Sequence, residues 1–188
     1  MTLAMLALVV GLVGCAQPGT KGAPCPAAEK VVARVNCGST AEYTCEMGMK
    51  WSVDQEYTAA AKWGAIGGKI TPRDPQPIPG CKAPGVFLSE RYGMSGYRFD
   101  LPNGKYTVRL LFAETWKGVT GPGMRVFGVT IQGKPVLTDF DVLKEAGAQF
   151  KPVRKEFKGV AVTDGKLMIE FQPKTQSPEI NGIIIVAE

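Results

Sequence analysis

Apolar and polar side chains alternate along short stretches of the second half of the chain, a period that is typical of half-buried β-strands. Residues 96–101 and 106–113 alternate in this way and flank the turn-forming sequence Pro-Asn-Gly-Lys. Residues 125–132 alternate again, and residues 135–138 follow them after a Gly-Lys turn. We therefore predict two β-hairpins, one in each of these regions.

More strands are predicted near the two ends of the chain. Residues 31–37 form a β-branched run, and residues 151–163, 167–172 and 180–187 carry strand-like patterns between turn signals. A helical pattern is confined to residues 140–148. At least seven short strands without a long helix predict an all-β fold, an antiparallel β-sandwich that is jelly-roll-like.

Residues 39–96 form a long region with little periodicity. The region is rich in Gly and Pro and contains several aromatic residues. A long loop in a compact domain is usually either disordered or functional, and the aromatic residues argue against disorder. We predict long aromatic, Gly/Pro-rich loops here, with Trp51 and Tyr57 packed inward because large aromatic side chains are usually buried.

The composition narrows the range of functions. The chain has 188 residues, the size of one domain, and 22 Lys and Arg against 17 Asp and Glu give a net charge of +5. The basic residues do not form a run of five or more, so we expect no nucleic acid partner. Because the sequence has no histidine, Ser-His-Asp and Cys-His catalytic systems and imidazole zinc sites are excluded.

The first residues have the features of an export signal. Residues 2–14 are apolar and uncharged, and they are too few to span a membrane. The segment Leu12-Val13-Gly14-Cys15 resembles the lipobox of bacterial lipoproteins, although no Lys or Arg precedes the apolar run. We expect residues 1–14 to be a signal peptide that is cleaved before Cys15, and Cys15 to carry lipid. The alternative is an N-terminal hydrophobic helix with an incidental cysteine.

The residues after Cys15 predict how the domain is attached. Residues 15–30 are rich in Pro, Gly and Ala, which is typical of a flexible tether, and residues 31–188 form the folded domain. Ala16 would be the second residue of the mature protein. An alanine there, with no aspartate, resembles the pattern of lipoproteins that are sent to an outer membrane. We therefore expect a protein of the bacterial cell envelope, anchored to the outer membrane through lipid.

Four further cysteines, Cys25, Cys37, Cys45 and Cys81, remain for an oxidising compartment, where disulfides are expected. We predict two bridges among them. Three pairings are open: Cys37 with Cys45 would close a short loop, and Cys25 with Cys81 would attach the tether to the long loop region. A cysteine zinc site is disfavoured because the sequence has neither a C-x-x-C pair nor a histidine.

Several segments together resemble the malectin and malectin-like domains, a family of carbohydrate-binding β-sandwiches. The resemblance runs from about Val31 to the C-terminus, and the order of the segments carries it more than any one of them. The segments are Val35-Asn36-Cys37-Gly38, residues 51–57, residues 63–68, Ser89-Glu90-Arg91-Tyr92, residues 96–106, residues 111–116, Arg125-Val126-Phe127, Gly133-Lys134, residues 139–142 and Asn181-Gly182-Ile183.

The resemblance implies a sugar site at one end of the sandwich, lined by aromatic side chains from the loops. The family's tyrosine after Glu-Arg corresponds to Tyr92, and the aromatic residue after its Phe-Ala-Glu segment corresponds to Trp116. A further aromatic residue before a glycine corresponds to Trp63. The chain departs from the family at Lys117, where a second aromatic residue is usual, and at Gln176, where an acidic residue is usual. These departures argue against the di-glucosylated high-mannose ligand of the animal proteins.

The chemistry of sugars independently favours these residues. Sugar rings present apolar C–H faces that stack on Trp or Tyr, and their hydroxyls need fixed polar partners. Glu114 ends an apolar strand, so a structural hydrogen bond is favoured over catalysis for its carboxyl group. The candidate carbohydrate-binding residues are Trp63, Tyr92, Glu114, Trp116, Lys117 and Gln176.

We predict no cofactor. Asp139 and Asp141 lie on one side of an extended segment and could join a structural calcium site, but no further calcium motif is present, and capping of a helix that begins near Phe140 is favoured.

The leading functional hypothesis is a non-catalytic carbohydrate-binding lipoprotein. A structural or assembly protein of the envelope is the alternative, suggested by the basic residues Lys151, Arg154, Lys155 and Lys158. An enzyme that acts on glycans comes third, because the sequence selects no acid–base pair among Glu90, Glu114 and Glu170.

Overall fold

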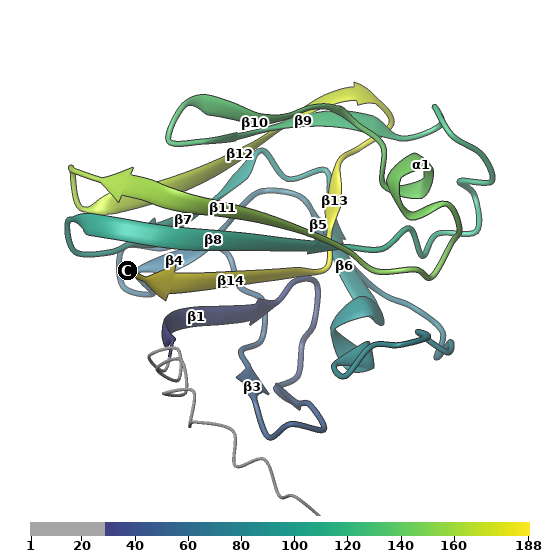
Figure 1. Ribbon diagram of the computed structural model, residues 1–188, viewed down its shortest axis with the longest axis horizontal. Helices are drawn as coiled ribbons and strands as arrows, with labels where there is room; N and C mark the ends of the chain where they lie inside the picture. The colour runs from purple at the N-terminus through teal and green to yellow at the C-terminus, as the bar shows by residue number, and fades with distance from the viewer. Residues whose placement is uncertain (1–28) are drawn as a thin grey trace, which may run out of the picture.

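A computed structural model of the chain describes residues 29–188 (Figure 1). The predicted signal peptide, the lipidation of Cys15, any bridge to Cys25 and the tether up to residue 28 lie outside the described residues. None of the helices in residues 29–188 is long and apolar enough to cross a membrane.

Two antiparallel sheets face each other and form a β-sandwich, as predicted (Figure 1). The four-stranded sheet has the order β1, β14, β8, β11, with bounds Lys30–Asn36, Gly182–Ala187, Gly104–Phe112 and Val153–Val162. The five-stranded sheet has the order β10, β9, β12, β7, β4, with bounds Lys134–Phe140, Val126–Ile131, Lys166–Thr175, Gly96–Asp100 and Trp63–Ile66.

Smaller elements lie beside and at one end of this sandwich. A three-stranded sheet has the order β13 (Glu179–Ile180), β6 (Ser89–Tyr92) and β5 (Lys69–Pro72), and the strands β2 (Tyr43–Thr44) and β3 (Lys50–Trp51) form a small hairpin. The short helices are η1 (Pro84–Phe87) and α1 (Val142–Ala146). In Figure 1, β6, β13 and α1 lie at the same end, away from the C-terminus.

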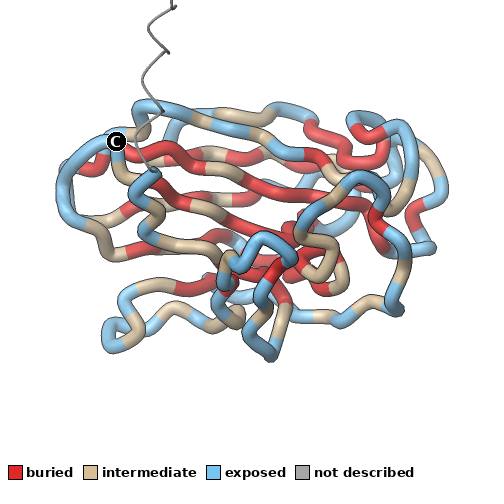
Figure 2. Tube along the Cα trace, turned by 60° about the horizontal axis from the view of Figure 1, so that its bottom comes forward, coloured by how far each residue is buried: buried red, intermediate tan, exposed pale blue. Residues whose placement is uncertain are grey.

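The core lies between the two large sheets, where the inward residues of each strand meet. Tyr97 and Phe99 of β7 and Leu110 and Phe112 of β8 are at most 1% exposed. Phe112 also lies 5.0 Å, between ring centroids, from Phe140. Figure 2 shows buried positions running along the strands, while the turns are exposed. The alternation that predicted the strands therefore also identified the core.

The predicted hairpin of residues 96–113 is wrong in its pairing. β7 pairs with β4 and β12, whereas β8 pairs with β14 and β11, so residues 101–103 carry the chain from one sheet to the other. A turn within a sheet and a crossing between two sheets use the same Pro, Asn and Gly residues, so the sequence pattern does not distinguish them. The second predicted hairpin is confirmed, because β9 pairs with β10.

The helical prediction is confirmed by α1, and its cap explains Asp141. The Asp141 carboxylate accepts a hydrogen bond from the Lys144 N–H at 3.0 Å, and Gly147 ends the helix with a left-handed backbone. Asp141 also accepts the Gly123 N–H at 2.5 Å. The capping interpretation is therefore the one that the structure bears out.

The region of residues 39–96 contains short strands where only loops were predicted. β2 to β6 are two to four residues long, too short to show a period of two in the sequence. Trp51 packs inward, as predicted, at 2% exposure. Tyr57 is half-buried and its hydroxyl donates to Asp100.

Within residues 29–188, Cys37, Cys45 and Cys81 form no disulfide with one another, so the predicted Cys37–Cys45 pairing is wrong, whereas a pairing with Cys25 lies outside the described residues. Cys37 is fully buried in the sandwich core, and its thiol faces the Val35 carbonyl oxygen. Burial raises the pKa of the Cys37 thiol well above its usual range. Core side chains enclose the Cys37 thiol and keep it from Cys45. The short spacing of the two cysteines along the sequence did not reveal this burial.

Candidate functional site

A pocket opens at the end of the molecule that carries β5, β6 and β13. Its volume is about 270 Å³, and it is bordered by the loop after β8 and by the segment between β12 and β13. The lining residues are Thr71, Arg73, Glu90, Tyr92, Trp116, Arg125, Gln176 and Ser177.

Strand β6 supplies one wall because its side chains alternate. Glu90 and Tyr92 line the pocket, whereas Ser89 and Arg91 point to the other side of the strand. Tyr92 pairs across the ladder with Glu179 of β13. The two-residue period of a strand therefore separates a ligand-facing side of β6 from a structural side.

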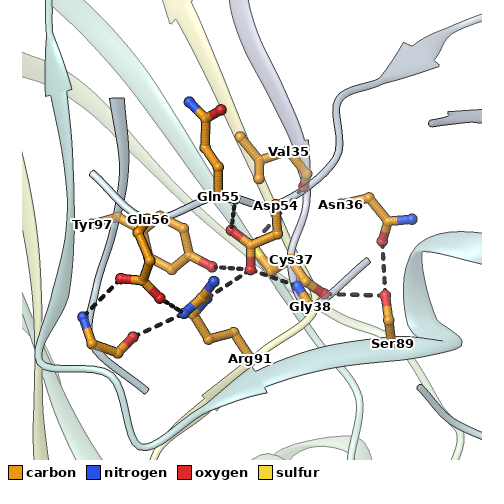
Figure 3. A network of polar contacts seen from close by, with 11 residues as sticks. Val35, Asn36, Cys37, Gly38, Asp54, Gln55, Glu56, Ser89, Arg91 and Tyr97 are labelled. Carbon is orange, nitrogen blue, oxygen red and sulfur yellow. Dashed lines mark hydrogen bonds and ion pairs between the residues drawn. The ribbon is translucent and has the colours of Figure 1, made fainter. Parts of the chain in front are cut away.

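The structural side of β6 is anchored by a buried polar network (Figure 3). Arg91 donates to Asp54 at 2.7 Å and to Glu56 at 2.5 Å. Asp54 also accepts from the Gly38 N–H at 2.7 Å and from the Tyr97 hydroxyl at 3.0 Å. The network joins β6 to the end of β1 and to the core, and it fixes the strand that presents Tyr92.

Trp116 is a fixed and open ring on the opposite wall. Its side chain is 40% exposed, while Gln149 donates to the Trp116 carbonyl oxygen at 3.1 Å and to that of Val119 at 2.7 Å. A Cβ at Gly118 would lie 2.4 Å from the indole, so glycine is needed for the ring to fold over this loop. Hydrogen bonds thus hold the backbone of this loop, and the Trp116 side chain is partly exposed at the pocket.

Charged side chains form the floor of the pocket. Glu90 is 1% exposed, forms an ion pair with Arg73 and accepts the Thr115 hydroxyl at 2.8 Å. The Nε of Arg125 lies 3.2 Å from Oε2 of Glu114, and its Nη1 lies 3.8 Å from Oε1 of Glu90. Carboxylates and guanidinium groups are thus buried side by side beneath the aromatic rings.

Burial changes the proton affinity of two carboxyl groups in this floor. Burial raises the pKa of Glu114 to about 7, and the Arg125 charge opposes the rise. Burial also raises the pKa of Glu179 well above its usual range, helped by the negative charge of Glu90. Glu179 is 0% exposed, and neither of its carboxyl oxygens has a hydrogen-bond partner within residues 29–188. Burial and the lack of hydrogen-bond partners in the described part of the chain thus both favour the protonated form of the Glu179 carboxyl group.

The structure brings together three of the predicted site residues, Tyr92, Trp116 and Gln176. Gln176 has a left-handed backbone with φ of 60°, which turns the chain between β12 and β13 and places it at the rim. Lys117 lines a neighbouring cavity of about 180 Å³ that shares Arg73 and Trp116 with the first.

The other two predicted residues lie elsewhere. Glu114 is fully buried beneath the pocket and accepts the Trp116 N–H at 3.0 Å, the structural role that was favoured. Trp63 lies on β4, and its ring stacks on Phe99 with centroids 5.9 Å apart and planes 5° apart. An indole on a strand that covers the core packs against it, so Trp63 does not belong to this pocket.

The sequence interpretation missed Arg73 and Arg125 as pocket residues. Arg73 follows β5 in a Pro-rich stretch without periodicity, and Arg125 precedes a strand like any solvated basic residue. Glu90 had a usable signal, since it stands two residues before Tyr92 and shares its side of β6.

Comparisons with known proteins agree with this fold. A model of the malectin domain matches residues 31–184. The chain is 27% identical over 165 residues to the kinesin-like protein KIN-14E of Oryza sativa subsp. japonica, which covers 84% of the chain and 14% of that protein. It is 42% identical over 79 residues to a probable LRR receptor-like serine/threonine-protein kinase of Arabidopsis thaliana, covering 40% of the chain and 8% of that protein.

Solved structures share the sandwich. A β-glucuronidase of Bacteroides uniformis superposes with a TM-score of 0.75 and 29% identity, over 83% of this chain and 18% of that one. The plant receptor-like kinase FER superposes with a TM-score of 0.67 and 20% identity, over 84% of this chain and 49% of that one, and shows a similar fold alone. The chain spans less than a fifth of the length of the curated relatives and of the β-glucuronidase.

Proposed function

Because this chain belongs to the malectin domain family, we propose that it is a non-catalytic carbohydrate-binding protein whose sugar site is the pocket of Tyr92 and Trp116. The observation that carries the proposal is Trp116, which is 40% exposed at the wall of a pocket with polar lining and whose backbone carbonyl oxygen accepts a hydrogen bond from Gln149. An open aromatic face stacks on the C–H face of a sugar ring, and nearby amide and hydroxyl groups bind its hydroxyls.

The polar residues at the rim suit such a ligand. Gln176, Ser177 and Thr71 carry amide and hydroxyl groups that both donate and accept hydrogen bonds, as sugar hydroxyls do. Trp116 and Arg73 also line the neighbouring cavity of about 180 Å³. A glycan of more than one sugar residue would therefore contact both cavities, with Trp116 between them.

The geometry supports binding over hydrolysis. A glycosidase needs two carboxyl groups on either side of the scissile bond. Glu90 is held by Arg73 and Thr115, and Glu114 is fully buried beneath the Trp116 backbone. The Glu90 carboxylate lines the pocket but is already held by Arg73 and Thr115, and Glu114 does not line the pocket.

We further propose that the domain is displayed on a bacterial cell envelope by a lipid on Cys15, at an outer membrane. The proposal rests on the lipobox-like sequence of residues 12–15 and on the apolar run before it. Cys15→Ala should move the domain from the membrane fraction to the soluble fraction. If the variant stays as membrane-bound as the parent, the anchor lies elsewhere.

The sugar-binding proposal is tested on an array of plant, microbial and peptidoglycan-derived glycans. We expect binding to a defined group of glycans, and Trp116→Ala should weaken it about tenfold to hundredfold. Met47→Ala is the matched control, because Met47 is 52% exposed and lies in the β2–β3 hairpin, outside the pocket. No binding to any glycan, or equal binding by the parent and Trp116→Ala, would contradict the proposal.

The structure offers no support for an assembly role through the basic strand. Lys155 forms an ion pair with Glu145, and Arg154 and Lys158 both lie beside Glu156. Two carboxylates, Glu145 and Glu156, therefore offset part of the positive charge that suggested this role.

A further inference from the structure

The floor of the pocket holds a buried cation, Arg125, two of whose donor nitrogens lack a well-formed hydrogen bond in the described part of the chain. Arg125 is 4% exposed, and within residues 29–188 neither its Nε nor its Nη1 has a hydrogen-bond partner of acceptable geometry. Its nearest carboxylate oxygens, on Glu114 and Glu90, lie 3.2 and 3.8 Å away. A guanidinium group has five N–H donors, and leaving them unpaired in a buried place is costly. An acceptor from outside the chain would relieve that cost.

Arg125 also borders the pocket. Its side chain lines the pocket, and its guanidinium carbon lies 5.8 Å from the centroid of the Trp116 ring. Arg73 lines the same pocket, with an 18% exposed side chain, and it is shared with the neighbouring cavity. Two guanidinium groups therefore border the space beside the aromatic wall.

The protonation of the carboxyl groups sets how far they neutralise these two cations. Glu90 is the partner of Arg73, and burial raises the pKa of Glu179 well above its usual range. The charged groups that face Glu114 are Arg125, Glu90 and Arg73, and the pKa of Glu114 is raised to about 7. When Glu114 is protonated, Arg125 loses the negative charge of its nearest carboxylate.

We infer that Arg73 and Arg125 bind the carboxylate of an acidic sugar, so that the ligand of this pocket is a glycan that contains uronic acid. The inference rests on the proposed function and names the substrate class of the same site. A guanidinium group matches a carboxylate with two parallel hydrogen bonds, which a neutral hydroxyl group cannot form. The pyranose ring would stack on Trp116 or Tyr92 while its carboxylate points to the floor.

The direct test compares each acidic glycan with its own neutral form. Oligosaccharides of glucuronate, galacturonate and mannuronate are immobilised, and a second set of the same oligosaccharides is reduced so that each carboxylate becomes a primary alcohol. We expect at least one uronate oligosaccharide to bind about tenfold or more tightly than its reduced form, since charge-assisted hydrogen bonds are roughly twice as strong as neutral ones. Trp116→Ala should weaken the binding of both forms.

Two outcomes overturn the inference, and they differ in what they say about the pocket. In the first outcome, the reduced glycans bind as tightly as the uronates, and Trp116→Ala weakens the binding of both. The pocket then binds sugar, but its arginines do not recognise a carboxylate. If neither set binds, the carboxylate inference and the proposed sugar site fail together.

A charge-neutral variant separates recognition from folding. Removing one arginine alone would leave a buried carboxylate unpaired, so Arg73→Gln is combined with Glu90→Gln, which removes a cation and its counter-charge together. We expect the ratio of uronate to reduced-glycan affinity to fall, because one of the two guanidinium groups is removed. Arg154→Gln is the control, because the Arg154 side chain lies on β11 and is 54% exposed. An unchanged ratio in the double variant overturns the inference.

The protonation of Glu114 gives an independent readout. An ionised Glu114 competes with the ligand for Arg125, so uronate affinity should fall about three- to tenfold between pH 6 and pH 8. Glu114→Gln keeps an oxygen acceptor for the Trp116 N–H and should remove this pH dependence. Uronate affinity that is constant over this range, or that rises with pH in the parent, contradicts the inference.

Discussion

Two buried arginines lie on opposite sides of strand β6, and they differ in how the protein uses them. Arg91 donates to Asp54, Glu56 and the Gly67 carbonyl oxygen, at 2.7, 2.5 and 3.0 Å (Figure 3). Arg125 is equally buried, yet it lies beside carboxylates without a well-formed hydrogen bond. A satisfied arginine holds a fold together, whereas an unsatisfied one that borders a pocket is placed for a ligand.

The largest expected effect concerns the satisfied arginine. Arg91→Met leaves the Asp54 carboxylate, with a side chain that is 0% exposed, without its cation. We expect the free energy of unfolding to fall by about 3–5 kcal/mol, the usual cost of breaking a buried ion pair from one side. Denaturant unfolding measures this cost. Arg98→Met is the control, because the Arg98 side chain is 35% exposed in its pair with Asp100 and should cost less than about 1 kcal/mol. Equal losses of unfolding free energy in Arg91→Met and Arg98→Met would show that the buried Arg91 ion pair is not a special source of stability.

The next effect is a pH dependence of stability from Glu114. Burial raises its pKa from the ordinary 4.5 to about 7, so the folded state holds the proton more tightly than the unfolded state. Stability from this group is complete below about pH 4.5 and is lost as pH rises to about 7, on the order of 3 kcal/mol in total. Glu114→Gln should flatten this part of the profile. Unfolding free energies measured from pH 4.5 to 7.5 test it, and parallel profiles for parent and variant would contradict it.

The smallest expected effect concerns the unsatisfied arginine, Arg125. Arg125→Met combined with Glu114→Gln removes the unsatisfied cation and its nearest carboxylate and keeps an acceptor for the Trp116 N–H. We expect a change in unfolding free energy within about 1 kcal/mol, because replacing a poorly bonded buried ion pair with uncharged groups is often neutral or stabilising. A loss as large as that of Arg91→Met would show that both arginines are structural.

The sequence predicted much of the sandwich and part of the pocket. Alternation along residues 125–138 predicted the β9–β10 hairpin, which is confirmed, because a period of two reports directly which side of a strand is buried. The same alternation failed to reveal that β7 and β8 belong to different sheets, since pairing depends on where the turn directs the chain. The resemblance to the family then indicated Tyr92, Trp116 and Gln176, which the fold brings to one pocket.

The rest of the site depends on three-dimensional contacts. Trp63 and Trp116 are both tryptophans beside glycine-containing segments, yet Trp63 stacks on Phe99 and Trp116 stays 40% exposed. The difference comes from the strand position of one and the loop position of the other. Arg73, Glu90 and Arg125 come from three separate segments, and their charges meet only when β5, β6 and β9 are assembled. The spacing of these residues along the sequence therefore does not predict that they contact one another.

The central claim is that the pocket of Tyr92 and Trp116 binds sugar, and titration calorimetry with a glycan identified on the array tests it most directly, with thermal melts in parallel. Tyr92→Ala and Trp116→Ala should each weaken binding about tenfold to hundredfold and leave the melting temperature nearly unchanged, because pocket-wall rings contribute little to the core. Phe99→Ala should instead melt early, since Phe99 is 1% exposed. Normal binding with early melting in Tyr92→Ala and Trp116→Ala would show that these rings are core residues and that the pocket is not the sugar site.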